Sequence, residues 1–83
     1  MTAIRYNMLA NKSSTPLPIS AIIRAANRFG CDIYIKSDES RFNVKDYDEL
    51  QRGMQFQRRW IIFYFEGTDE KEANRSFRIL FGV

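Results

Sequence analysis

The segment RRWIIFYFEG, at residues 58–67, constrains the fold of this 83-residue chain more strongly than any other stretch. Its apolar side chains alternate between two sides: Ile61, Phe63 and Phe65 lie on one, and Trp60, Ile62 and Tyr64 lie on the other. Alternation of β-branched and aromatic residues over this length is typical of a β-strand. We expect the first set to face the helices of a layered fold and the second set to face away from them.

Three shorter segments alternate in the same way and predict strands at residues 3–9, 31–37 and 41–44. The polar turn SDES separates the last two, which together predict a β-hairpin. Cys31 opens its strand on the side that should be buried, and this position favours an inert core thiol over a reactive one.

Apolar residues at helical spacing predict two longer helices. The first runs from about residue 16 to residue 28, and Gly30 is suited to its C-terminal cap. The other runs from residue 68 or 69 almost to the end of the chain. Its acidic residues lie in the first turn and its arginines lie nearer the end, as the helix dipole favours.

A short helix is predicted by DYDEL, at residues 46–50. Asp46 is suited to its N-cap, Glu49 completes a capping-box-like pair, and Gly53 can end it. The element order is then β-α-β-β-α-β-α. Four strands with three helices on one face make an open-faced α+β sandwich. We expect residues 1–83 to form a single domain of this kind.

Composition excludes several classes of protein. Hydrophobic residues make up 45% of the chain, which is enough for a packed core, so a disordered chain is not expected. The single cysteine cannot form an internal disulfide, and the segment MTAIRYNML has neither a long apolar run nor a cleavage site. No run approaches the roughly 18 apolar residues that span a membrane. We therefore expect a cytoplasmic protein.

The charged residues indicate neither a nucleic-acid surface nor a metal site. The net charge of +3 is mild, and acidic and basic residues are mixed along the chain, so nucleic-acid binding is not expected on charge alone. The carboxylates at residues 46, 48 and 49 lack the spacing of a metal-binding loop. No cofactor is expected. The chain also contains no histidine.

The element order and several short motifs resemble HPr, the phosphocarrier of the bacterial sugar phosphotransferase system, and its histidine-lacking relative Crh. The run AANRF at residues 25–29 is similar to the first helix of Crh, and GTDEKEA at residues 67–73 is similar to the opening of the family's last helix. The register holds from Tyr6 to Ala73 without a gap. The matching positions include Pro18, Ala26, Phe29, Asn43, Lys45, Gly67, Asp69, Glu70 and Ala73.

The resemblance also shows where this chain departs from the family. The family's active loop carries a histidine that accepts phosphate through Enzyme I, and that position is Thr15 here. An arginine two residues on helps to hold the phosphate, and that position is Leu17. The residues Thr15, Pro16, Leu17 and Pro18 therefore form a remnant active loop. The resemblance implies a protein that is not an enzyme and has no catalytic residue.

A second departure falls at Asp46, the position of the regulatory serine in Gram-positive members. An aspartate there can imitate phosphoserine with a smaller charge, or it can serve only as an N-cap, and the two roles are compatible. In the family, the residues around this serine contact Enzyme I, a kinase and a transcriptional regulator. The corresponding docking candidates here are Lys45, Asp46, Tyr47, Leu50 and Gln51. Asp48 and Gln51 replace apolar contacts of the family, and this replacement disfavours docking to the usual partners.

The face predicted to point away from the helices combines Tyr34, Trp60, Ile62 and Tyr64, with Arg5 and Lys36 at its margin. Three interpretations remain open. Long polar neighbours cover the face, or a second copy binds through it or by strand exchange, or bases stack on it. The Gly/aromatic motif of RNA-binding sheets is absent, which disfavours the last.

The resemblance therefore implies an HPr-like bacterial protein without phosphocarrier activity. Its expected role is regulation or protein interaction alongside the phosphotransferase system, for example in catabolite regulation. The expected partner is a component of that system or a transcriptional regulator. The alternatives are a phosphoacceptor that uses Thr15 or a nearby serine and is fed by a protein kinase, and a structural homodimer built on the aromatic outer face.

Overall fold

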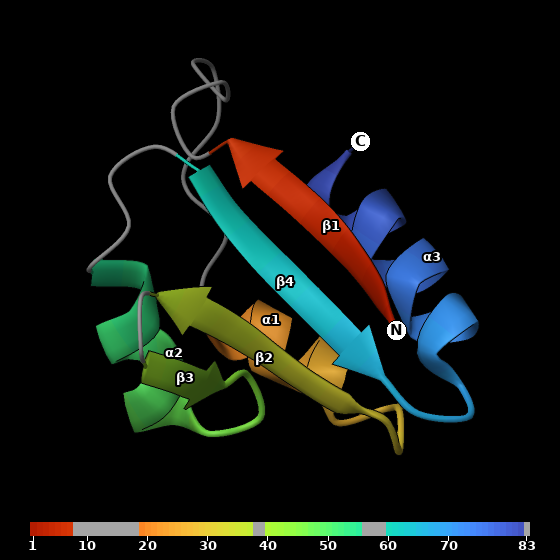
Figure 1. The fold of residues 1–83 in the computed structure, drawn as a ribbon, viewed down its shortest axis with the longest axis horizontal. Coiled ribbons are helices and arrows are strands. Elements are labelled where there is room, and N and C mark those ends of the chain that lie inside the picture. Colours follow the sequence, from red (N-terminus) through yellow and green to blue (C-terminus); the bar gives the residue numbers. More distant parts are fainter. Residues whose placement is uncertain (8–18, 38–39, 56–59, 83) are drawn as a thin grey trace.

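A four-stranded antiparallel sheet forms one layer of the protein (Figure 1). The computed structural model describes residues 1–7, 19–37, 40–55 and 60–82. The central strand β4 (Trp60–Glu66) lies between β1 (Thr2–Asn7) and β2 (Asp32–Ser37). The strand β3 (Ser40–Asn43) lies at the edge and pairs with β2 as the predicted hairpin.

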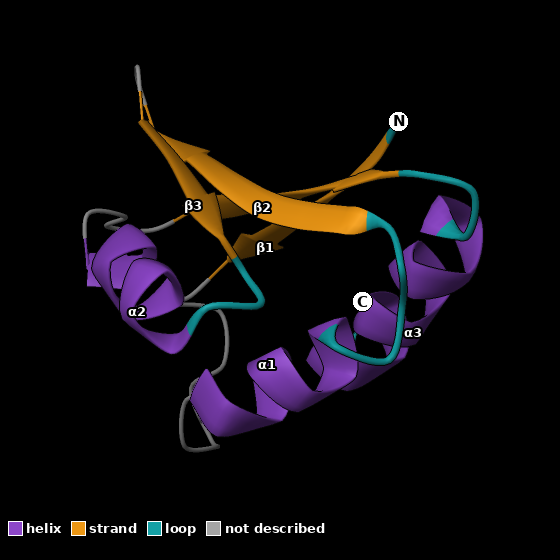
Figure 2. Ribbon diagram, turned by 90° about the horizontal axis from the view of Figure 1, so that it is seen from below, coloured by secondary structure: helices purple, strands orange, loops and turns teal. Residues whose placement is uncertain are grey.

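Three helices form the second layer, all on the same side of the sheet (Figure 2). They are α1 (Ile19–Ala26), α2 (Tyr47–Gln55) and α3 (Glu70–Phe81). The helix α3 lies against β1 and β4, α2 lies against β3 and β2, and α1 contacts both other helices. The predicted element order and the open-faced α+β sandwich are confirmed.

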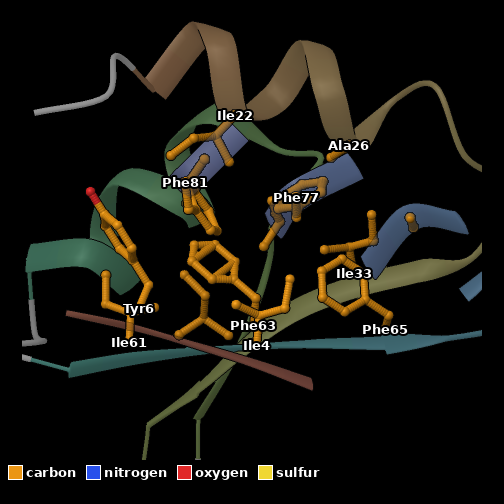
Figure 3. Packing of buried hydrophobic residues seen from close by; sticks show 14 of the residues in the cluster. Ile4, Tyr6, Ile22, Ala26, Ile33, Ile61, Phe63, Phe65, Phe77 and Phe81 are labelled. Carbon is orange, nitrogen blue, oxygen red and sulfur yellow. The ribbon is translucent and has the colours of Figure 1, made fainter. Parts of the chain in front are cut away.

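The core is the space between the two layers, and the inner face of β4 lies at its centre (Figure 3). Ile61, Phe63 and Phe65 are fully buried, as the alternation predicted. The ring of Phe65 meets that of Phe77 edge-on, with centroids 5.1 Å apart, and Phe63 lies 5.1 Å from Phe81. Each fully buried side chain of this size stabilises the fold by about 1.5–3 kcal/mol.

Two glycines have other roles than the predicted ones. The helix α2 does not end at Gly53 but continues to Gln55. A Cβ at residue 53 would lie 3.0 Å from Phe42, so glycine lets α2 pack closely on β3. Gly30 does not adopt the positive φ of a C-terminal cap. Its N–H instead donates to the carboxylate of Asp69 at 2.8 Å.

This carboxylate joins two loops that are distant in the sequence. Asp69 precedes α3, makes no side-chain bond to that helix, and accepts from the N–H groups of Gly30 and Cys31 at 2.8 and 2.9 Å. Beside it, Gly67 has φ +153°, and a Cβ there would lie 2.8 Å from the Cα of Cys31. The turn that follows β4 is therefore held against the chain that enters β2.

No helix in these described ranges is long and apolar enough to cross a membrane.

Substituting Gly67 tests how much the fold depends on this close approach. We expect Gly67→Ala to lower the free energy of unfolding by about 2 kcal/mol or more, because the new Cβ adds a backbone clash to an unfavourable φ. The matched control is Gly82→Ala, where φ is +75° and no atom lies within 4 Å of the added Cβ. We expect the control to cost about 1 kcal/mol. Urea unfolding measures both, and equal losses would contradict the role assigned to the contact with Cys31.

Acidification tests the role of Asp69. The N–H of Gly30 is the main cause that lowers the pKa of this carboxyl below its ordinary value of 3.8. A lowered pKa means that the carboxylate stabilises the fold above about pH 4, and that this contribution is lost as the pH falls through the folded-state pKa. We expect urea midpoints of the wild type to fall more steeply below pH 4 than those of Asp69→Asn. Parallel pH profiles would contradict this account.

Candidate functional site

A groove of about 590 Å³ lies between α1 and the start of α2. Ile23 contributes an apolar side chain to it, and Arg24 and Arg28 of α1 contribute two cations. Tyr47, the first residue of α2, lines the groove from the other helix and is 53% exposed. A half-exposed tyrosine flanked by arginines is the composition that protein interfaces favour.

Asp46 lies next to this groove and caps α2 as predicted. Its Oδ1 accepts from the N–H of Glu49 at 3.1 Å, while its own N–H donates to the carbonyl of Asn43 at 3.2 Å. The side chain remains exposed to solvent. The capping role is therefore confirmed, and imitation of phosphoserine remains a prediction.

The capping box is only half formed. The carboxylate of Glu49 accepts from the N–H of Asn43 at 3.2 Å instead of returning to residue 46. The side-chain oxygen of Asn43 accepts from the N–H of Lys45 at 3.0 Å. Because the side chains of Glu49 and Asn43 accept hydrogen bonds from N–H groups of the same turn, they fix the position of Asp46.

Lys45 connects this turn to α1. Its ammonium donates to the carbonyl of Phe29, just beyond α1, at 2.7 Å, and its side chain is partly buried. Lys45 therefore has a structural role, and its docking role stays a prediction. Sequence reasoning missed this bond because nothing local pairs a lysine with a carbonyl sixteen residues earlier.

The resemblance predicts a docking role for Leu50, but the structure buries this residue away from the surface. Its side chain is fully buried in the core, because its position in α2 faces the sheet. The docking candidates at the surface are Asp46, Tyr47 and Gln51, all of which are exposed. Thr15, Pro16, Leu17 and Pro18, predicted to form the remnant active loop, lie outside the described residues.

On the outer face of the sheet, two arginines cover two of the aromatic residues. Tyr34 is only 6% exposed, because the guanidinium of Arg41 lies 3.7 Å from its ring centroid and the ring of Tyr64 stacks on it at 5.4 Å. Arg5 lies 4.2 Å above Trp60, which remains 40% exposed. Polar neighbours thus cover part of the face.

The contribution of Arg41 was missed in the sequence. The hairpin register pairs residue 34 with residue 43 and residue 36 with residue 41, so Arg41 is a diagonal neighbour of Tyr34. Diagonal neighbours in a sheet lie within reach of long side chains. The signal was available once the register was fixed.

Cys31 is buried, as its position in the strand indicated. Burial is the main cause that raises the pKa of its thiol to about 11, and the nearby carboxylate of Asp69 raises it further. The thiol therefore stays protonated and unreactive at neutral pH. The described ranges hold no group of three or more metal-ligating side chains.

No protein-family model matches the chain, and no curated protein matches its sequence. Solved structures do match. HPr-C-His from Thermoanaerobacter tengcongensis superposes with a TM-score of 0.78 at 20% identity, and the match covers 99% of this chain and 92% of that chain. The histidine-containing phosphocarrier protein of Mycoplasma gives a TM-score of 0.74 at 18% identity over 94% of this chain and 89% of the other.

Crh of Bacillus subtilis, described as an intertwined dimer with a swapped domain, gives a TM-score of 0.59 at 22% identity. That match covers 86% of this chain and 91% of Crh. At identities this low, the superpositions establish the fold alone. It is a four-stranded sheet with three helices on one face, arranged as in HPr and Crh.

Proposed function

We propose that this chain is an HPr-like protein that carries no phosphate and acts by binding, as a regulatory or interaction module related to the sugar phosphotransferase system. One observation carries the proposal: the chain with this fold contains no histidine. A phosphohistidine carrier needs an imidazole nucleophile with a pKa near neutrality. In this proposal Thr15 and Leu17 stand where the resemblance to the family expects the histidine and the phosphate-holding arginine.

The groove between α1 and α2 supports a binding role. Tyr47 offers an aromatic anchor at low entropic cost, and Arg24 and Arg28 offer cations to a partner. These features fit a protein surface that combines an apolar pocket with acidic residues.

Asp46 adds a permanent negative charge beside this groove. In the proposed function it stands where regulated relatives gain a phosphate, with one charge in place of about 1.5 to 2. Because its carboxylate is exposed while it caps α2, the same side chain can serve both roles.

The absence of phosphate transfer is directly testable. We expect no phosphorylated product when the chain is incubated with phosphoenolpyruvate and Enzyme I, because no imidazole is present to accept the phosphoryl group. Intact-mass spectrometry measures the product, and a histidine-containing HPr in the same reaction is the positive control. A phosphorylated form of this chain would contradict the proposal, and mapping the site would show whether Thr15 is the acceptor.

A further inference from the structure

Charged side chains on the outer face of the sheet are segregated by sign. Asp32 of β2 lies directly opposite Glu66 of β4, and both are exposed. Lys36 of β2 lies directly opposite Arg41 of β3, and both are exposed as well. Like charges directly opposite one another destabilise a sheet. The face therefore holds two unfavourable pairs, one of two acidic residues and one of two basic residues.

Little within the described part of the chain compensates these pairs. The side chains of Asp32, Glu66 and Lys36 make no hydrogen bond or ion pair with any described residue, and the side chain of Arg41 makes only its contact with the ring of Tyr34. A surface whose acidic and basic residues could neutralise each other, but are kept apart, is suited to a partner with the opposite arrangement.

Asp32 and Lys36 lie symmetrically about a row of two tyrosines, whereas the guanidinium of Arg41 lies over the ring of Tyr34 in that row. Tyr34 and Tyr64 are cross-strand partners with stacked rings. Asp32 comes two residues before Tyr34 and Lys36 comes two residues after it, so each lies about 7 Å from the row along the strand. Rotating the face by 180° about an axis that runs along the tyrosine row exchanges the acidic end with the basic end.

We propose that the outer face of the sheet binds a second copy of this chain, related by a two-fold axis along the Tyr34–Tyr64 row. In this arrangement Asp32 of each copy faces Lys36 of the other copy. Such an interface is isologous, the form found in most homodimers. Partly exposed Ile62 and Tyr64, together with Trp60, supply its apolar contacts.

The same charges disfavour a nucleic acid as the occupant, because Asp32 and Glu66 would repel its phosphates. The outer face also lies on the side of the sheet opposite the helices (Figure 2). The groove between α1 and α2 therefore stays open in the dimer, and the inference is independent of the proposed function.

Charge exchange between the two positions tests the proposal. We expect the wild type to dimerise reversibly in sedimentation equilibrium between about 1 µM and 1 mM, and added salt to weaken the dimer. Asp32→Lys and Lys36→Glu should each weaken it at least about tenfold, since each sets like charges face to face. The double variant Asp32→Lys/Lys36→Glu should recover the dimer, and an equimolar mixture of the two single variants should form a heterodimer.

The controls are Glu72→Lys and Lys71→Glu, which make the same charge changes at exposed positions of α3. They should leave the dimer unchanged. All substituted side chains are exposed, and circular dichroism checks that each variant folds. A chain that is monomeric up to 1 mM overturns the proposal. So does a dimer that ignores the charges at residues 32 and 36, as expected of strand exchange or of another face.

Discussion

Phe63 and Phe65 of the central strand pack against the aromatic residues of α3, and this contact determines where the other elements can lie. Burying the inner face of β4 places all three helices on one side of the sheet. That arrangement has two consequences for function. It leaves the outer face of the sheet without a covering layer, and it brings α1 and α2 together at a groove on the far side.

Longer-range polar contacts then fix the loops on this framework. Asp69 holds the turn after β4 to the start of β2, and Lys45 holds the turn before α2 to the end of α1. The second contact matters for the proposed function, because it sets the position of Asp46 and Tyr47 relative to α1. The bond of Lys45 therefore holds in place the turn that carries the proposed docking surface.

Alternation and helical spacing were sufficient to predict the element order, the layers and most of the core. This worked because each pattern reports directly on which face of an element is buried. The roles of Gly53 and Gly30, and the structural role of Lys45, could not be predicted, since they depend on Phe42, Asp69 and Phe29, which only the folded chain brings near. Leu50 is buried because its position in α2 faces the sheet, as its spacing already indicated. The remnant loop at residues 15–18 stays a prediction from the resemblance.

The central claim is that this fold keeps a docking surface between α1 and α2 while lacking the carrier histidine. A quantitative pull-down from the source organism's lysate tests it most directly, with the wild type, Tyr47→Ala, Asp46→Asn and Ile79→Ala as baits. Ile79 is the matched control, an apolar side chain of α3 that is 77% exposed and lies away from the groove. Asn keeps the helix cap without the charge. The account predicts a partner that the wild type and Ile79→Ala retain and that Tyr47→Ala and Asp46→Asn lose. Identical recovery by all four baits would contradict it.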